Sequence, residues 1–171
     1  MAPNQITAQS SAGAIIYRII EGKIVVLLLY QNNSFYKRSS RRANKQVIDI
    51  GPCGRLEEKE SAIVAAHREI LQEIGIKVNI DTNFDMSYSY TFIAEALSGE
   101  NLGKKIRINK TRRYFAARIK EEDSINIKIS NEHSKFIWMD INDAINYNKI
   151  VLDQKRLLKA FSLYALKKNG L

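Results

Sequence analysis

The sequence predicts an α/β protein in which helices pack on a mixed β-sheet. Segments rich in β-branched apolar residues come before and after one central segment with the helical period, which is typical of such a fold. The chain has 171 residues, 45% of them hydrophobic, which is enough for one domain with its own core. It contains no repeat or linker, and its two prolines are Pro3 and Pro52. We therefore expect one domain over residues 1–171, with residues 1–10 flexible.

The first third of the chain predicts a hairpin and a basic loop. Ala12–Ile20 and Lys23–Gln31 are apolar and β-branched and are joined by a glycine-containing turn, so they are predicted to pair. The polar and basic segment 32–45 is typical of a loop. A short strand is expected at Gln46–Ile50, where a Gly-Pro pair ends it.

The central and later segments complete the alternation of strands and helices. A helix is predicted at Ser61–Ile74, because apolar residues recur at helical spacing and Gly75 follows as a typical C-terminal glycine. Further strands are predicted at Phe84–Glu95, Ile106–Ile119, Ile125–Ile129 and Phe136–Met139, and further helices at Ala144–Tyr147 and Leu152–Lys167.

The central helix carries two glutamates on one side. At about 100° per residue, the arc predicted to face the core consists of Ile63, His67, Ile70, Leu71 and Ile74. Glu69, Gln72 and Glu73 lie on the opposite, solvated side. The i, i+4 carboxylates repel each other by roughly 0.2–0.5 kcal/mol, unless a divalent cation lies between them. Mg²⁺ suits such a place, although an isolated pair at this spacing is most often a solvated acidic face.

The residues around this helix resemble the Nudix box. From Gly54 to Ile76 the sequence reads GRLEEKESAIVAAHREILQEIGI, which is similar to G-x5-E-x7-R-E-U-x-E-E-x-G-U, where U is aliphatic. The matching positions are Gly54, Glu60, Arg68, Glu69, Ile70, Glu73, Gly75 and Ile76. Gln72 departs from the acid of the pattern. The chain contains neither G-x-x-x-x-G-K-[ST] nor G-x-G-x-x-G, so phosphate-loop and Rossmann sites lose support.

The resemblance implies an α/β/α sandwich with a loop–helix–loop catalytic motif. It also implies hydrolysis of a nucleoside diphosphate linked to another group, by water that attacks phosphorus, with Mg²⁺ or Mn²⁺ bound by box glutamates. Glu69 and Glu73 would then be metal ligands, and Cys53 would add its backbone carbonyl. Arg68 and Glu60 would pair to hold the loop and orient the helix. The alternative for that pair is an ordinary surface ion pair worth under about 1 kcal/mol.

Two departures from the box bear on the metal requirement. The amide of Gln72 can orient a water or coordinate through its oxygen, but it contributes no charge. Fewer negative charges should weaken the site for a second or third metal. Lys59 stands where a glycine often precedes the box glutamate, which implies a different turn. Because Glu69 and Glu73 are retained, we expect an active enzyme with altered metal requirements.

Similarity beyond the box indicates one branch of the family. SAGAIIYR and VVLLLYQ resemble the opening of asymmetrical diadenosine tetraphosphate hydrolases, TRRYFAARI resembles their aromatic strand, and SNEHSKFIWMDINDA resembles their E-H-x-x-x-x-W segment. The resemblance covers about residues 11–165. In those enzymes the Glu of E-H lies over the metals as a ligand or base, which assigns these roles to Glu132. His133 is a candidate for substrate binding, with an ordinary loop histidine as the alternative.

Positive charge indicates an anionic partner. Lys and Arg number 27 against 18 Asp and Glu, so the formal net charge is +9. The excess gathers in two basic clusters, one over residues 37–45 and one over residues 104–113. A basic surface attracts anions, which favours a polyphosphate or nucleic acid over a neutral ligand. The alternative for either cluster is a solvated, solubilising face.

The substrate-binding residues follow from the branch resemblance and its departures. The family often has Pro-Pro-Lys-Gly-His before the helix, whereas this chain has GPCGR, so the phosphate-contacting lysine is missing. Arg55, Lys110 and Arg112 are expected to neutralise the polyphosphate. Strand aromatics more often belong to a core, but three tyrosines are candidates for stacking an adenine: Tyr90 first, then Tyr88 and Tyr114.

We therefore expect a Mg²⁺- or Mn²⁺-dependent enzyme that cleaves a dinucleoside polyphosphate, such as diadenosine tetraphosphate, to ATP and AMP. Two alternatives stay open: a pyrophosphohydrolase of RNA 5′ ends, and a non-catalytic Nudix domain that binds nucleotide or RNA.

Cys53 is the single cysteine, which excludes internal disulfides and cysteine-based zinc or iron–sulfur sites. No secretory signal or bilayer-spanning run is visible, so we expect a cytoplasmic protein without a membrane partner. The oligomeric state stays open.

Overall fold

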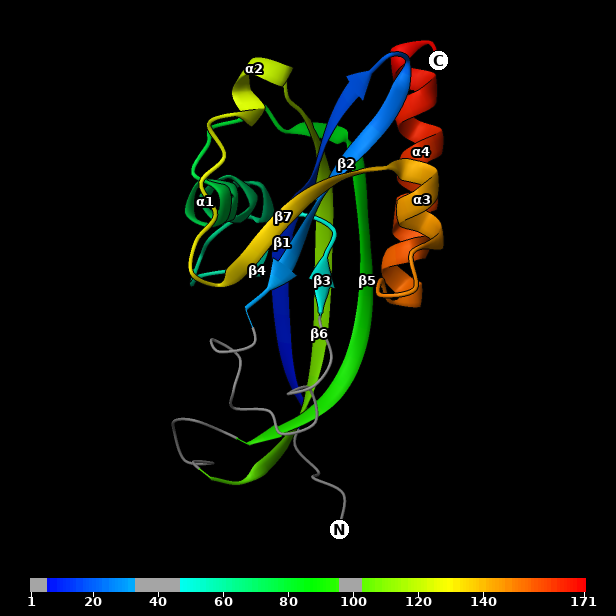
Figure 1. Cartoon of the computed structure of the whole chain (residues 1–171). Helices are drawn as coiled ribbons and strands as arrows, with labels where there is room; N and C mark the ends of the chain where they lie inside the picture. The colour runs from blue at the N-terminus through cyan, green and yellow to red at the C-terminus, as the bar shows by residue number, and fades with distance from the viewer. Residues whose placement is uncertain (1–5, 33–46, 96–102) are drawn as a thin grey trace.

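The computed structural model describes residues 6–32, 47–95 and 103–171. These residues form a seven-stranded sheet of order β3-β2-β1-β6-β5, with β4 paired to β1 and β7 to β2 (Figure 1). The strands are β1 (Ile6–Ile20), β2 (Lys23–Gln31), β3 (Ile48–Asp49), β4 (Cys53–Arg55), β5 (Asp81–Glu95), β6 (Lys105–Arg118) and β7 (His133–Asp140). The helices are α1 (Ala62–Ile74), α2 (Glu121–Ser124), α3 (Ile141–Asn146) and α4 (Leu152–Asn169). The predicted α/β fold with a mixed sheet is confirmed.

The sheet separates two apolar layers. On one face, Ile70 and Ile74 of α1 pack against alternate residues of β1, such as Ile16. On the other face, Leu158 and Phe161 of α4 pack against the intervening residues of β1. α1 and α4 therefore lie on opposite sides of the sheet (Figure 1), which makes an α/β/α sandwich.

β1 is the central strand and positions β4. It pairs antiparallel with β2 and β4, and parallel with β6 from Ile6 to Tyr17. Residues 6–10 were expected to be flexible, but these parallel contacts with β6 include them in the strand. A Cβ on Gly13 would lie 1.9 Å from the Pro52 carbonyl oxygen, so the segment entering β4 can approach β1 only over a glycine.

Several segments differ from the sequence-based expectations. Ile125–Ile129 was predicted as a strand but follows α2 as a loop, because Ile127 packs on the α1 layer and the Lys128 backbone N–H donates to the Ile74 carbonyl. Gln46, the first residue of the strand predicted at Gln46–Ile50, lies outside the described residues, and the strand found in the rest of that range is Ile48–Asp49; β4 was not predicted. The basic loop and its cluster at residues 37–45 lie outside the described residues. None of the described helices is long and apolar enough to cross a membrane.

The packed face of α1 differs from the predicted arc. Leu71 is 46% exposed, His67 is exposed, and Ile63 is only half-buried. The buried residues of the helix are Ala65, Ala66, Glu69, Ile70, Glu73 and Ile74. The small alanines let the helix approach the sheet closely, so the contact face is rotated toward the two glutamates. A helical wheel read from the large apolar side chains alone does not show this rotation, because it leaves out the two alanines.

Adjacent helix positions test this face. Ile70→Ala should lower the free energy of unfolding by about 2–5 kcal/mol, because the Ile70 side chain is 1% exposed and a cavity would remain. Leu71→Ala should lower it by less, about 1 kcal/mol at most, since nearly half of Leu71 is exposed. Urea titrations of both variants measure the difference. Equal losses would contradict the observed face.

Candidate active site

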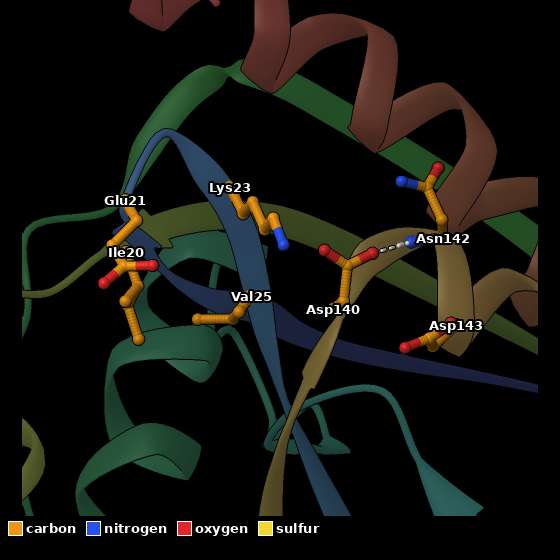
Figure 2. Close-up of a pocket in the computed structure, with 7 residues that line it drawn as sticks. All are labelled: Ile20, Glu21, Lys23, Val25, Asp140, Asn142 and Asp143. Carbon is orange, nitrogen blue, oxygen red and sulfur yellow. Dashed lines mark hydrogen bonds between the residues drawn. The ribbon is translucent and has the colours of Figure 1, made fainter.

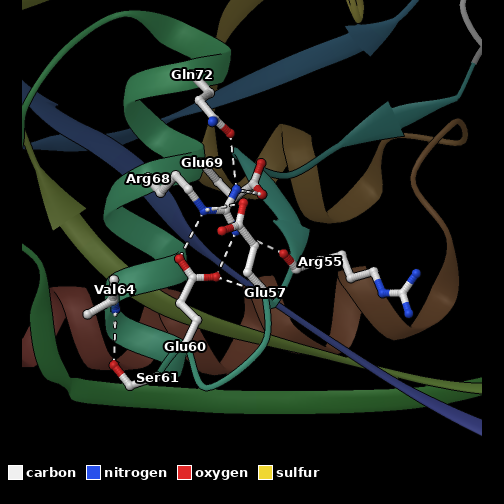
Figure 3. Close-up of polar contacts among 8 residues, drawn as sticks. All are labelled: Arg55, Glu57, Glu60, Ser61, Val64, Arg68, Glu69 and Gln72. Atoms are coloured by element: carbon white, nitrogen blue, oxygen red, sulfur yellow. Dashed lines mark hydrogen bonds and ion pairs between the residues drawn. The ribbon is translucent and has the colours of Figure 1, made fainter.

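The residues of the predicted box form a strand, a loop and a helix. β4 runs along β1, a loop follows, and Ser61 begins α1 by accepting a hydrogen bond from the Val64 backbone N–H at 3.4 Å (Figure 3). α1 ends at Gly75, whose φ of 72° lies in the left-handed region that glycine adopts readily. The loop–helix geometry expected from the sequence is therefore present.

Arg68 ties the loop to the helix. Its Nε and Nη2 donate to the two carboxylate oxygens of Glu60 at 2.9 and 2.8 Å, and Nη2 also donates to the Arg55 carbonyl at 2.9 Å (Figure 3). Together with the Glu57 backbone N–H, the Arg68 contact lowers the pKa of Glu60 to about 2, so this carboxylate stays ionised. The pairing of Arg68 with Glu60 is thus observed, while its part in catalysis stays a prediction.

Glu69 lies directly beneath β4. It is 8% exposed, and its Oε1 accepts from Arg68 Nη1, which also donates to Gln72 Oε1 at 3.1 Å. A Cβ on Gly54 would lie 2.0 Å from the Glu69 carboxyl, so only glycine lets β4 cross there. Burial raises the pKa of Glu69 although Arg68 opposes the shift, and nearby Glu132 raises it further.

Glu73 is buried one turn further along the helix, with 5% exposure. Its Oε1 accepts from the Cys53 backbone N–H at 3.2 Å, and its Oε2 lies 2.7 Å from His133 Nε2. Burial raises the pKa of Glu73 to about 6, against the lowering effect of His133. Burial disfavours the charged form of His133, but Glu73 outweighs it and raises the pKa of the imidazole. Both glutamates are therefore buried and hydrogen-bonded, and the solvated face predicted for them is wrong.

The segment before β7 lies against the end of α1, near the carboxylate cluster formed by Glu69 and Glu73. The Ser130 backbone N–H donates to the Glu73 carbonyl at 2.9 Å, and the His133 backbone N–H donates to the Ser130 carbonyl at 3.2 Å. These bonds hold the segment against the end of α1, which brings Glu132 close enough to raise the pKa of Glu69. These backbone bonds therefore place Glu132, from a distant part of the chain, near the end of the helix that carries Glu69 and Glu73.

Cys53 takes part through its backbone. Its thiol packs on the α4 side of the sheet, and burial raises the pKa of the thiol to about 12. The thiol therefore stays protonated and is a poor metal ligand. This agrees with the expectation that only the peptide group of Cys53 would contact an ion, which stays a prediction.

Strand register places the predicted cations on one face of the sheet. Ser11 of β1 pairs with Arg55 of β4 on one side and with Arg112 of β6 on the other. Lys110 lies two residues before Arg112 and therefore shares its face. The Arg55 side chain extends away from the Arg68 contacts (Figure 3). The three expected phosphate-binding cations are thus brought together.

The tyrosines stack along the same face. Ring centroids are 6.4 Å apart for Tyr114 and Tyr88, 6.0 Å for Tyr88 and Tyr90, and 5.8 Å for Tyr90 and Phe92. Tyr114 is fully buried in the core, so the prediction that it contacts substrate is wrong, and it supports Tyr88 instead. Tyr90 is partly exposed, so it stays a candidate for stacking on an adenine base.

A surface hollow of about 520 Å³ lies apart from these residues, at the β1–β2 turn and the start of α3 (Figure 2). It is lined by Ile20, Glu21, Lys23, Val25, Asp140, Asn142 and Asp143. Asp140 caps α3 by accepting from the Asn142 backbone N–H at 2.8 Å. None of the seven residues is a predicted site residue, so the hollow is not part of the candidate site.

Comparison with known proteins identifies the family. The family model described as the NUDIX domain matches residues 9–161. The chain belongs to the Nudix family. Its fold is similar to that of a C. elegans Ap4A hydrolase in a binary complex, with a TM-score of 0.62 and 25% identity over 93% of this chain and 98% of that chain. No curated protein sequence matches the chain.

Two further solved structures share the Nudix fold with this chain. The MutT protein from Methanosarcina mazei Go1 has a TM-score of 0.59 and 20% identity over 96% of both chains. The E. coli dihydroneopterin triphosphate pyrophosphohydrolase has a TM-score of 0.56 and 18% identity over 91% of this chain and 95% of that chain. At these identities the likeness shows the fold alone.

Nudix hydrolases cleave pyrophosphate bonds of nucleotides and generally use divalent metals such as Mg²⁺. The donor set here fits such an ion, because hard cations prefer carboxylate and carbonyl oxygens. Within the described ranges, however, no three acidic, histidine or cysteine side chains are already arranged to ligate one ion. Glu69 contacts Arg68 and Glu73 contacts His133. An ion bound there would compete with Arg68 and His133 for the oxygens of these two carboxylates.

Sequence reasoning missed Asp49 and its contacts. Asp49 is 7% exposed and accepts from Arg112 Nη1 at 2.9 Å and from Gln31 Nε2 at 2.6 Å. The sequence did contain a clue, because Asp49 is the single acid within the apolar run VIDI. An acid in such a run indicates a buried charge that requires a partner. The partner could not be named, because it comes from a strand that lies far away in the sequence.

The stability of the metal-free protein should fall as the pH rises from about 5 to 8. The pKa of Glu73 in the folded state, about 6, exceeds its ordinary value of 4.5, and the pKa of His133 is also raised. The folded protein then binds more protons than the unfolded chain, so the free energy of unfolding decreases as the pH rises through about 6. Urea titrations in EDTA measure it. Glu73→Gln should flatten the slope, and an equally steep slope in that variant would contradict this assignment.

Proposed function

We propose that this protein is a Mg²⁺- or Mn²⁺-dependent pyrophosphohydrolase that cleaves a dinucleoside polyphosphate, such as diadenosine tetraphosphate, into ATP and AMP. One observation carries the proposal: β4 contacts Glu69 and Glu73 from one side and contributes Arg55 to the other sheet face, which bears further cations and tyrosine rings. Carboxylates suit a divalent ion, cations suit a polyphosphate, and aromatic rings suit a base. The likeness to the C. elegans Ap4A hydrolase supports this substrate. We expect the protein to act in the cytoplasm.

The proposed reaction adds water across one phosphoanhydride bond. The water oxygen bonds to a phosphorus atom, the bridging P–O bond breaks, and ATP and AMP leave. Glu69 and Glu73 would hold the ion, which supplies Lewis-acid polarisation of a phosphoryl oxygen when bound. Glu132 would serve as a further ligand or accept the proton of the water. Arg68 would keep the loop and helix aligned through Glu60.

The cationic face would hold the rest of the substrate. Arg55, Lys110 and Arg112 would neutralise the phosphate chain, and burial together with Arg112 lowers the pKa of Lys110. Tyr90 would stack on a base. His133 was expected to touch substrate, but its contact with Glu73 favours a role in holding that carboxylate.

Two observations support other candidates. The net charge of +9 favours an RNA 5′ end, and Gln72 favours a domain that binds nucleotide without cleaving it. Turnover assays with Mg²⁺ and Mn²⁺ on diadenosine tetraphosphate, nucleoside triphosphates and 5′-triphosphate RNA separate them. ATP and AMP as products support the proposal. Turnover of RNA alone would show that the substrate is an RNA 5′ end. Nucleotide binding without any turnover would show a non-catalytic binding domain.

Removing the charge of Glu73 should abolish turnover. Glu73→Gln should lower kcat by more than roughly 100-fold, since partners one layer outside a metal already contribute about 10–100-fold. The matched control is Glu58→Gln, which removes an exposed acid from the same loop–helix region and should leave kcat unchanged. Circular dichroism checks that both variants fold. Full turnover of the Glu73 variant at saturating Mg²⁺ would refute the metal site.

Restoring the common box acid should lower the metal requirement. In Gln72→Glu, the new carboxylate would attract Arg68 Nη1, which now contacts both Glu69 and Gln72. Glu69 would then be freer to bind an ion, and the Mg²⁺ concentration for half-maximal rate should fall severalfold. Initial rates across a Mg²⁺ titration measure this. An unchanged or higher requirement would show that position 72 does not influence the ion.

A further inference from the structure

Arg112 is held from across the sheet by a buried acid. Its Nη1 donates to Asp49 Oδ1 at 2.9 Å, and the other Asp49 oxygen accepts from Gln31 Nε2 at 2.6 Å. The side chains of Arg112 and Asp49 are 14% and 10% exposed, and Gln31 is also buried. Three strands, β6, β3 and β2, thus contribute to one chain of charge-assisted hydrogen bonds.

Stability alone is a weak reason for such a pair. Burying an arginine and an aspartate costs desolvation energy, and apolar residues of similar volume often stabilise a fold as well or better. The pair also leaves donors unused. Among the residues that the structure describes, neither the buried Nε of Arg112 nor the buried Oγ of its cross-strand neighbour Ser11 has a hydrogen-bond partner. Because both of these polar atoms are buried, they add a desolvation cost, so stability alone does not explain the pair.

The position of the pair fits the phosphate chain. The Cys53 backbone N–H donates to Glu73, and Cys53 pairs with Gly13 of β1, two residues from Ser11, the β1 partner of Arg112. On the other side, Arg112 pairs with Tyr88 of β5, the neighbour of Tyr90 in the stack. Arg112 therefore lies between the carboxylate cluster and the tyrosine rings. Phosphates that join a bound ion to a stacked base would pass this point.

We propose that Asp49, oriented by Gln31, is a positioning residue that fixes the guanidinium of Arg112 for binding the phosphate chain of the substrate. This inference rests on the proposed function. A flexible arginine loses side-chain entropy when it binds phosphate, and an arginine already fixed by a carboxylate has lost much of that freedom beforehand. The benefit therefore belongs to substrate binding, and it should appear in KM more than in kcat.

The chain offers a matched control on the same strand. Arg113, the next residue of β6, forms a bidentate ion pair with Asp85 of β5. That pair lies on the opposite face, and its side chains are 46% and 37% exposed. Asp85→Asn therefore removes an aspartate–arginine pair without touching the proposed phosphate path.

The experiment compares Asp49→Asn with Asp85→Asn. Asp49→Asn should raise KM for diadenosine tetraphosphate about tenfold and change kcat less than about twofold, because the amide can still accept a hydrogen bond but no longer carries the charge that fixes the guanidinium. Asp85→Asn should change neither. The double variant Asp49→Asn with Arg112→Lys should have the KM of Arg112→Lys alone, since Asp49 acts only through the arginine. Gln31→Met, a milder change, should raise KM by a few fold if Asp49→Asn does not fold.

Calorimetric binding of ATP separates failure of this inference from failure of the proposed function. ATP affinity should fall about tenfold in Asp49→Asn whether or not the unmodified protein turns over diadenosine tetraphosphate. Absent turnover with this loss of affinity would refute only the proposed activity. Unchanged KM and ATP affinity in Asp49→Asn, or additive effects in the double variant, would overturn the role of Asp49. Absence of ATP binding by the unmodified protein would overturn both.

Discussion

The close approach of β4 to α1 is the constraint on which the site depends. Gly54 crosses directly over the Glu69 carboxylate, and the Cys53 backbone N–H donates to Glu73, so one strand fixes both glutamates. Buried carboxylates are costly unless they are hydrogen-bonded or paired. An arginine and a histidine supply those partners in the metal-free protein. A divalent ion could take over the same compensation, which is why the pair suits metal binding.

The same approach joins the two faces of the sheet. α1 lies on one face, while β4 turns its Arg55 side chain to the other, where Arg112 and Lys110 already lie. Gly13 makes this possible, because any side chain there would collide with the segment entering β4. The carboxylates and the cations are therefore neighbours although they belong to different layers. Asp49 strengthens this junction by linking β3 to β6, which β2 and β1 separate in the sheet.

Local patterns in the sequence predicted the elements, and contacts between distant elements decided the rest. The spacing from Gly54 to Ile76 predicted the loop and helix correctly, because caps and box residues are near each other in the chain. The burial of Tyr114 and the rotation of α1 could not be predicted, since they depend on which layer covers each face. Ile125–Ile129 alternates like a strand, yet its backbone bonds to the end of α1. The Asp49–Arg112 pair joins strands distant in sequence, so no local pattern contained it.

The position of a bound Mn²⁺ ion tests the central claim most directly. Anomalous diffraction from crystals grown with Mn²⁺ locates the ion independently of any assumption about catalysis. The account predicts Mn²⁺ within about 2.0–2.3 Å of carboxylate oxygens from both Glu69 and Glu73. Mn²⁺ bound at saturating concentration without a ligand from either glutamate would contradict it.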